Sequence, residues 1–320
     1  MSGQARACDK LLENMKPCSF FILFTLSAFA QDIVWAPKAD LLPKYVSPHK
    51  PHTKLAEVKA KHVGQANWTE LVVNDDMLRG EYVASAPGTK VPKQLHPDTR
   101  EFWIVLDGQI RFEIENQQPF VASKGYMVQV PFQTFFSMET VGDKPSLRWQ
   151  VNVPTAHTLY AAEADAPAMP GFHWLPVRMA RKCCEYGHGN KPYVTFEEAA
   201  QANEEKRVKG TQRIVQDDRE TGNFIYGYEK NLPALNPNER GHYHSESSEF
   251  WLIMAGQIRY PIEGQQLIIA SEGDVVYVPK FTFHAPRFYG PGPSCRFAMN
   301  GYPDIAHLFD AKPAKTTSTK

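Results

Sequence analysis

The chain repeats itself, and this repeat constrains its fold more than any other feature of the sequence. Residues 101–137 align without a gap onto residues 249–285, at a constant offset of 148 (249 minus 101), and about half of the aligned positions are identical. The tripeptide Glu-Phe-Trp at 101–103, for example, recurs at 249–251. Self-similarity of this length indicates two copies of one structural unit.

Each copy has the pattern of a β-structure. Short runs of β-branched and aromatic residues alternate with Gly and Pro, and tight turns are predicted at Asp107-Gly108 and Ala255-Gly256. The chain has 320 residues, of which 42% are hydrophobic, so it is long enough for two cores. An all-β protein with two similar domains is therefore expected.

A two-part motif in the second copy narrows the choice of protein family. His242, His244, Glu249 and Gly256 form a His-x-His pair followed by Glu and then Gly, and a later stretch has Gly273, Pro279 and His284. This pattern resembles the two conserved motifs of the cupin superfamily, although Phe281 stands where the family usually has a second Gly. The resemblance covers roughly residues 70–155 and 210–305. It implies two cupin barrels, of the double-stranded β-helix or jelly-roll type, joined by a partly helical connector.

The second copy is predicted to bind a metal through His242, His244, Glu249 and His284. Alternate side chains of a strand point to the same face, so His242 and His244 are expected to be neighbours in the barrel interior. Three imidazoles and one carboxylate suit a divalent first-row transition metal and leave coordination positions open for chemistry. One such metal ion per chain is expected.

The first copy has an incomplete set of the same residues. The offset of 148 places Gln94, His96, Glu101 and Phe136 at the four ligand positions. Because Gln is a weak ligand and Phe is none, the first barrel is expected to be a structural partner of the second. An apolar ligand pocket in the first barrel remains an alternative.

Three further residues are candidates for substrate contacts. Arg240 and Trp251 have the strand parity of the ligands, so Arg240 would pair with an acidic substrate and Trp251 would line the pocket. The alternatives are an Arg240 exposed to solvent and a Trp251 in the core. Tyr277 is a weaker candidate, as are Tyr226 and Tyr228, because buried tyrosines more often serve packing.

The remaining segments define the expected domain boundaries. Residues 31–155 are assigned to the first barrel, 156–208 to a connector, 209–311 to the second barrel and 312–320 to a disordered tail. The connector is rich in Pro, and Thr195 with Glu198 forms a capping box that predicts one helix.

The N-terminus resembles a signal peptide. Residues 20–30 (FFILFTLSAFA) are apolar or small and end in Ala-Phe-Ala, which predicts cleavage after Ala30 and places the mature protein in the periplasm or outside the cell. Met15 is the better start, since it begins a short basic region before the apolar run. A buried segment or an uncleaved anchor is the alternative.

The mature chain would keep Cys183, Cys184 and Cys295, too few for a disulfide framework. Adjacent cysteines rarely chelate one ion well, so a metal site made by Cys183, Cys184 and His188 is not favoured. A disulfide with Cys295, or simple burial of the cysteines, is the preferred prediction.

Charge indicates the class of partner. The sequence has 35 basic and 35 acidic residues, which argues against coating nucleic acid or an anionic membrane and favours a small-molecule substrate. A homo-oligomer is left open. The cupin resemblance implies a metal-dependent oxidoreductase, such as a dioxygenase acting on a small phenolic or carboxylate compound. A decarboxylase, lyase or isomerase, and a cupin that binds without turnover, are the alternatives.

Overall fold

The computed structural model describes residues 32–208, 210–234 and 239–311. The expected signal peptide at 1–30 and tail at 312–320 therefore lie outside the described residues. Residues from Ala36 onward form one compact unit. The following description concerns the unit that begins at Ala36.

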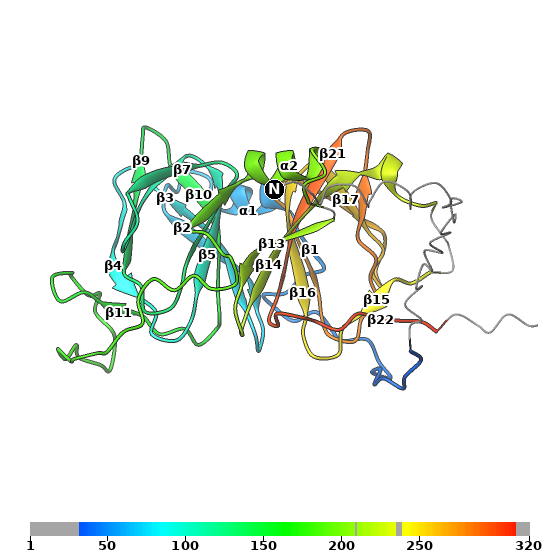
Figure 1. Cartoon of the computed structure of the whole chain (residues 1–320), viewed down its shortest axis with the longest axis horizontal. Helices are drawn as coiled ribbons and strands as arrows, with labels where there is room; N and C mark the ends of the chain where they lie inside the picture. Colours follow the sequence, from blue (N-terminus) through cyan, green and yellow to red (C-terminus); the bar gives the residue numbers. More distant parts are fainter. Residues whose placement is uncertain (1–31, 209, 235–238, 312–320) are drawn as a thin grey trace, which may run out of the picture. The chain divides into compact units, whose positions relative to one another are not determined.

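The first repeat contains one helix and a set of antiparallel strands (Figure 1). In chain order its elements are β1 (His52–Thr53), α1 (Leu55–Lys61), β2 (Trp68–Asn74), β3 (Arg79–Ser85), β4 (Lys90–Leu95), β5 (Glu101–Asp107), β6 (Gln109–Ile114), β7 (Phe120–Ser123), β8 (Tyr126–Val130), β9 (Phe136–Val141), β10 (Ser146–Asn152) and β11 (Leu159–Tyr160).

The second repeat has the same elements in the same order, with one added 3-10 helix. They are β12 (Tyr193–Thr195), α2 (Phe196–Glu204), β13 (Thr211–Gln216), β14 (Thr221–Tyr228), η1 (Glu229–Asn231), β15 (His242–Tyr243), β16 (Glu249–Ala255), β17 (Gln257–Tyr260), β18 (Ile268–Ser271), β19 (Val275–Val278), β20 (Arg287–Tyr289), β21 (Pro293–Asn300) and β22 (Leu308–Phe309). The structural repeat is thus longer than the stretch that aligns without gaps in the sequence.

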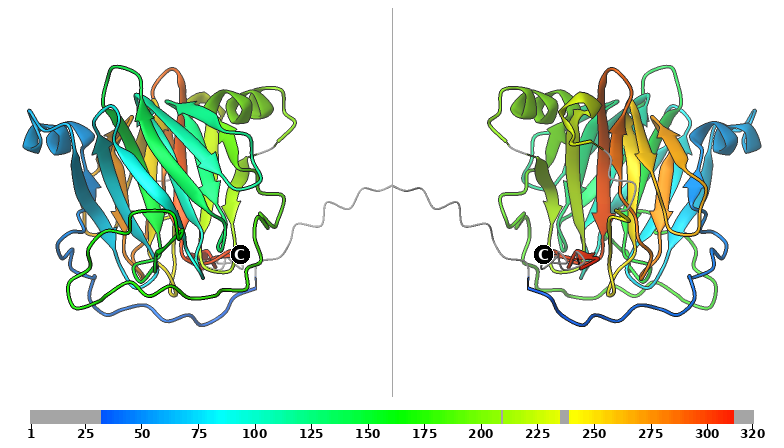
Figure 2. Two further views of the ribbon diagram at one scale, coloured as in Figure 1. Left: turned by 90° about the vertical axis from the view of Figure 1, so that its left-hand side faces the viewer. Right: turned by 90° about the vertical axis from the view of Figure 1, so that its right-hand side faces the viewer.

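The strands pair into two barrels, which Figure 2 shows from opposite sides. The first barrel has a six-stranded sheet, β12-β8-β5-β10-β3-β2, and a five-stranded sheet, β11-β4-β9-β6-β7. The second barrel has the six-stranded sheet β1-β19-β16-β21-β14-β13, with β18-β17-β20 and β15-β22 opposite. Two barrels of antiparallel strands are therefore present, and the predicted all-β fold is confirmed.

A glycine closes the same predicted hairpin in each repeat. Gly108 links β5 to β6 with φ +69°, and Gly256 links β16 to β17 with φ +64°. A Cβ atom on Gly108 would lie 2.6 Å from the carbonyl oxygen of Pro145, and one on Gly256 would lie 2.6 Å from that of Pro293. Only glycine accepts both the left-handed backbone and this close approach.

The two repeats exchange their first strands. Strand β1 pairs with β19 of the second barrel, and β12 pairs with β8 of the first. Asp274 fixes the exchanged arm, because its carboxylate contacts His52 Nε2 at 2.8 Å and accepts from the Leu55 backbone N–H at 3.0 Å. The sequence-based division assigned residues 31–155 to the first barrel, whereas β1 completes a sheet of the second.

Strand parity divides the core into three clusters. Trp103 and Val105 point into the first barrel, and Trp251 and Ile253 point into the second. The alternate side chains of β5, β10, β16 and β21 form a third cluster that both barrels share, with Trp149 Nε1 3.4 Å from Met299 Sδ. The large faces of the two barrels are therefore buried against each other.

Residues 156–208, expected to form a connector, contain helix α2 and also β11 and β12, which pair in the sheets of the first barrel. The Thr195 hydroxyl accepts a hydrogen bond from the Glu198 backbone N–H at 3.1 Å, as a capping residue does, and α2 follows directly. The preceding residues cross the first barrel as an extended segment before β12.

Candidate metal centre

Strand β15 presents the His-x-His pair at one end of the second barrel. Tyr243 lies between the two histidines and turns away from them to pack on Phe283, with ring centroids 4.9 Å apart. The backbones of His242 and His284 exchange two hydrogen bonds, of 3.1 and 2.9 Å. Local strand pairing therefore brings the second motif onto the first.

The loop between Pro279 and His284 keeps the conformation that the usual glycine would give it. Phe281 has φ +62°, and its backbone N–H donates to the His244 carbonyl at 2.7 Å. Gln133 occupies the same position in the first barrel with φ +59°, and its N–H donates to the His96 carbonyl at 2.7 Å. The departure at Phe281 therefore leaves the turn intact.

The four predicted ligands meet in one cluster. One potential donor atom from each of His242, His244, Glu249 and His284 lies within 4.8 Å of all the others. Glu249 Oε2 lies 3.0 Å from His244 Nε2 and 3.2 Å from His284 Nε2. Ring centroids are 5.0 Å apart for His242 and His244, and 4.5 Å apart for His242 and His284.

Backbone carbonyls orient two of the imidazoles. His244 Nδ1 donates to the Ala306 carbonyl at 2.7 Å, and His284 Nδ1 donates to that of Thr282 at 2.9 Å. With Nδ1 protonated, each ring turns Nε2 toward the cluster, which is the arrangement that metal-binding histidines use.

His242 provides the sharpest test of whether a cation fits. Its Nε2 atom is buried and has no hydrogen-bond partner among the described residues. Burial, reinforced by the neighbouring His284, lowers the pKa of His242 to about 2, so the ring is neutral at physiological pH. A neutral imidazole with an unpaired buried nitrogen beside a carboxylate is a donor set that suits a divalent transition metal.

Glu249 supplies the negative charge. It is almost completely buried, which by itself raises the pKa of its carboxyl group, but hydrogen bonds from His244 and His284 outweigh burial and lower it. Burial likewise lowers the pKa of His244, and its hydrogen bond to Glu249 reverses this and raises it. The carboxylate is therefore ionised inside the barrel.

The candidate substrate residues take different places. Arg240 is half exposed, forms a bidentate ion pair with Asp310 at 2.8 and 2.7 Å, and stacks on Phe283. It therefore lies at the surface, which agrees with the alternative that Arg240 is exposed to solvent. Trp251 is buried in the barrel core, and its ring lies 5.3 Å from that of His284, so it forms a floor beneath the cluster.

The tyrosines lie elsewhere. The Tyr277 hydroxyl donates to Asp75 Oδ2 at 3.3 Å, in the region where the two barrels meet. The hydroxyls of Tyr226 and Tyr228 both donate to Glu204. None of the three belongs to the cluster.

Sequence reasoning missed His307. Its ring centroid lies 4.5 Å from that of His242 and 4.8 Å from that of His244. It lies outside both parts of the cupin motif and outside the aligned repeat, so no spacing pointed to it.

The first barrel retains half of the arrangement. His96 Nε2 lies 2.7 Å from Glu101 Oε2, and His96 Nδ1 contacts the His157 carbonyl at 2.9 Å. Gln94 pairs with Phe136 in the sheet, and the buried Phe136 ring lies 5.8 Å from the ring of His96. An apolar ring therefore fills the place of the third imidazole.

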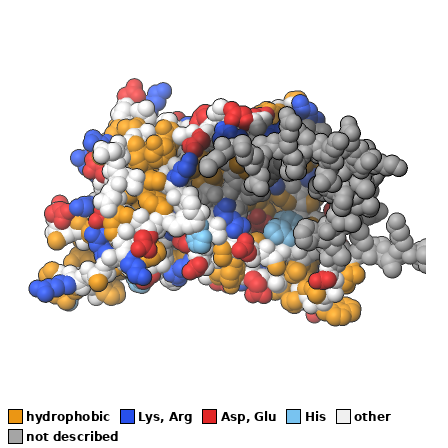
Figure 3. All heavy atoms as spheres, in the orientation of Figure 1, with side chains coloured by type: hydrophobic (Ala, Val, Ile, Leu, Met, Phe, Trp, Pro, Cys, Tyr) orange, Lys and Arg blue, Asp and Glu red, His pale blue; other side chains and the backbone are white. Residues whose placement is uncertain are grey.

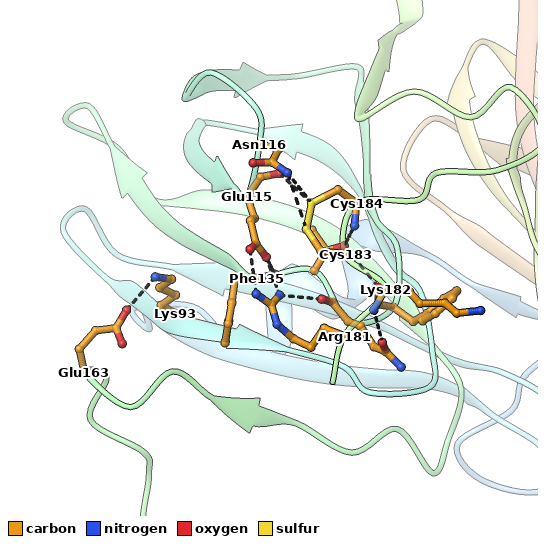
Figure 4. Close-up of polar contacts among 12 residues, drawn as sticks. Lys93, Glu115, Asn116, Phe135, Glu163, Arg181, Lys182, Cys183 and Cys184 are labelled. Atoms are coloured by element: carbon orange, nitrogen blue, oxygen red, sulfur yellow. Dashed lines mark hydrogen bonds and ion pairs between the residues drawn. A yellow bond between two sulfur atoms is a disulfide. The ribbon is translucent and has the colours of Figure 1, made fainter. Parts of the chain in front are cut away.

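The mouth of the first barrel carries an unexpected disulfide, which Figure 4 shows. Cys183 bonds to Cys184, and Cys295 is buried and free. The expectation of pairing with Cys295 or plain burial was wrong for this pair, because both cysteines lie on a segment far from Cys295. Beside the disulfide, Arg181 forms ion pairs with Glu115 at 2.7 and 2.9 Å.

On the face drawn in Figure 3, acidic and basic side chains are interspersed, and neither kind predominates. This agrees with the 35 acidic and 35 basic residues of the sequence. Within the described ranges, no helix combines the length and apolar character needed to cross a membrane.

Comparisons with known proteins agree with this geometry. The family model described as the cupin domain matches twice, at residues 81–153 and 234–299. No curated protein matches the sequence. A variant of the salicylate 1,2-dioxygenase of Pseudoaminobacter salicylatoxidans shares the fold at 14% identity with a TM-score of 0.60, over 86% of this chain and 92% of that one.

Two further structures of the same dioxygenase are also similar. One, at 14% identity, has a TM-score of 0.57 over 82% of this chain and 86% of that one. The other, a variant in complex with gentisate at 13% identity, has a TM-score of 0.57 over 82% and 85%. Two family matches, one on each barrel, together with the shared fold, establish that this chain is a two-domain cupin.

Proposed function

We propose that the second barrel binds one divalent transition metal through His242, His244, Glu249 and His284, and that the protein is an oxidoreductase. The observation that carries this proposal is the buried His242 Nε2 atom, which lacks a hydrogen-bond partner among the described residues and faces three other donors. Leaving such an atom unpaired costs about 1–3 kcal/mol, and coordination would remove that cost.

The residues of the centre have distinct roles in this proposal. A bound metal would supply Lewis-acid and redox chemistry to a substrate and O₂. Glu249 balances its charge, and the carbonyls of Ala306 and Thr282 hold His244 and His284 in the tautomer that leaves Nε2 free. Trp251 excludes water from beneath the imidazoles.

The reaction class proposed is dioxygenation of a small phenolic or carboxylate compound. Its support is the fold shared with a salicylate dioxygenase that also forms a complex with gentisate, both of them aromatic acids. Arg240 is paired with Asp310, so the centre itself has to provide the contact with the acidic group of the substrate.

Oxygen consumption tests this function. The protein, reconstituted separately with Fe, Mn, Co, Ni, Cu and Zn, would be mixed with a panel of aromatic acids and phenols while O₂ uptake and CO₂ release are recorded. We expect O₂ uptake with one metal and its loss in His244→Ala, whereas His96→Ala, the matched change in the first barrel, keeps it. Release of CO₂ without O₂ uptake would instead establish a decarboxylase.

We also propose that the protein is exported. The support is the apolar run at residues 20–30, with small residues before Gln31. Sequencing of the N-terminus should find a chain that begins at Gln31 in the periplasmic or secreted fraction. An intact terminus at Met1 or Met15 on cytoplasmic protein would contradict export.

A further inference from the structure

We infer that His307 is a fourth imidazole of the metal centre, an additional nitrogen donor contributed by residues 301–311, here called the C-terminal strap. This inference rests on the proposed function, since it needs a metal at His242, His244, Glu249 and His284. It adds a ligand that lies outside both cupin motifs.

The ring of His307 is as close to the cluster as the proposed ligands are to one another. Its centroid lies 4.5 Å from that of His242 and 4.8 Å from that of His244. The corresponding distances within the cluster run from 4.5 Å, for His242 and His284, to 5.3 Å, for His244 and His284.

His307 also has a hydrogen bond like those that orient His244 and His284. Its Nδ1 contacts the carbonyl of Ile305 at 3.0 Å, two residues earlier in the chain. His284 Nδ1 contacts the carbonyl of Thr282, likewise two residues earlier, at 2.9 Å. In both rings this bond leaves Nε2 as the nitrogen available to a metal, an arrangement that metal-binding histidines use.

The C-terminal strap is held against the centre by three contacts. Strand β22 pairs with β15, so that Phe309 lies opposite His242. The Ala306 carbonyl, next to His307 in the chain, accepts the Nδ1 hydrogen bond of His244 at 2.7 Å. Asp310 closes the bidentate ion pair with Arg240. The backbone that carries His307 is thereby fixed beside the imidazoles.

The first barrel has an equivalent strap, with no imidazole at the position of His307. Leu159 pairs with Leu95, and Leu308 pairs with the equivalent Tyr243, so Thr158 occupies the position of His307. The barrel that lacks two of the three motif imidazoles therefore also lacks this one. The histidine is present only where the other donors are complete.

His307 is exposed and lies beside the four proposed ligands. It lies outside the group of four donors that are mutually within 4.8 Å, so coordination requires its ring to turn inward. Because His307 is an exposed residue, this needs a rotation of its own side chain and no movement of the buried core. Four nitrogens and one carboxylate would then surround the metal, with a position left for substrate.

Cobalt binding tests this inference without measuring turnover. Co²⁺ would be titrated into the metal-free full chain in competition with a coloured chelator, and the visible absorption spectrum of the bound ion recorded. The variant is His307→Thr, which installs the residue of the first barrel. The matched control is His157→Thr, which removes an imidazole from the equivalent strap of the first barrel.

We expect His307→Thr to weaken Co²⁺ binding by at least about tenfold and to change the spectrum, as losses around a metal site usually do. His157→Thr should leave both unchanged. Wild-type affinity and an unchanged spectrum in His307→Thr would overturn the inference while leaving the proposed function intact. If the wild-type protein binds no Co²⁺, the proposed function fails first. If His307→Thr melts early, His307→Asn, which keeps a polar side chain, decides in the same assay.

Discussion

Glu220 offers a test of the reasoning about buried charge. It lies in the turn between β13 and β14, is 1% exposed, and neither carboxyl oxygen has a hydrogen-bond partner among the described residues. Burial, together with the charge of Asp217, raises the pKa of Glu220 well above its usual value. The folded protein therefore keeps this carboxyl group protonated at pH values where the unfolded chain has lost the proton.

The repeat supplies the substitution. Asp217 accepts hydrogen bonds from the backbone N–H groups of Arg219 and Glu220, as Asp75 does from those of Met77 and Leu78 in the matching turn. Leu78, which is also 1% exposed, therefore occupies the position of Glu220 in the other repeat. Glu220→Leu places a side chain that the same turn already accommodates.

The expected effect depends on pH. A buried unpaired polar group costs about 1–3 kcal/mol, so Glu220→Leu should raise the free energy of unfolding by about that amount near pH 5. As pH rises above the unfolded-state pKa of about 4.3, wild type loses stability until the folded-state pKa is reached, at up to about 1.4 kcal/mol per pH unit. The advantage of the variant should therefore be larger at pH 8.

Urea unfolding at pH 5 and pH 8 measures both quantities. Glu220→Gln is the control, since it keeps a polar group and removes the titration, so it should abolish the extra pH dependence with little gain at pH 5. The alternative is that Arg100 keeps Glu220 ionised, because Arg100 lies near Glu220 and forms a 3.3 Å contact with Asp217. A Glu220→Leu protein less stable than wild type at both pH values would show that Glu220 is an ionised partner of Arg100, and the reasoning would be refuted.

Other predictions follow from the metal centre and the barrel contacts. Elemental analysis after dialysis should find about one metal ion per chain, lost in His244→Ala and kept in His96→Ala; two ions would show that the first barrel also binds. Metal binding should weaken as pH falls, since protons compete with the metal for imidazoles such as His244, whose pKa lies above its ordinary value, and a chelator titration at several pH values would detect this. Trp149→Ala should cost about 3–5 kcal/mol and leave one cooperative transition, because both barrels share its cluster; calorimetry would reveal separate melting if they were independent. Asp274→Ala should cost at least about 1–3 kcal/mol and expose the exchanged arm to proteolysis, since it removes the contacts to His52 and the Leu55 N–H.

The four proposed ligands were found from the sequence because their positions depend on local rules. His242 and His244 share a face through strand alternation, and the Gly-to-Pro spacing of the second motif sets where His284 lies. The capping box before α2 is equally local, since Thr195 and Glu198 are three residues apart. The repeat added the long-range prediction of two similar barrels, because similar sequences form similar strands in the same order.

Side-chain direction at the edge of the site could not be found in this way. Parity placed Arg240 with the ligands, but Asp310, far along the chain, draws its guanidinium to the surface. His307 has no motif of its own and reaches the centre only because β22 pairs with β15. The bond between Cys183 and Cys184 likewise depends on the path of the segment across the first barrel.

The sequence by itself predicted two similar β-barrels and an unequal set of candidate ligands in them, because these follow from periodicity and from comparison of the repeats. Only the tertiary structure decided which barrel each first strand joins. The edges offered by β8 and β19 are alike, so residue pattern cannot choose between them, and the choice depends on distant contacts such as those of Asp274 with His52. The surroundings of His307 and Glu220 could not be predicted for the same reason, since strand pairing and burial depend on which distant segments meet in the fold.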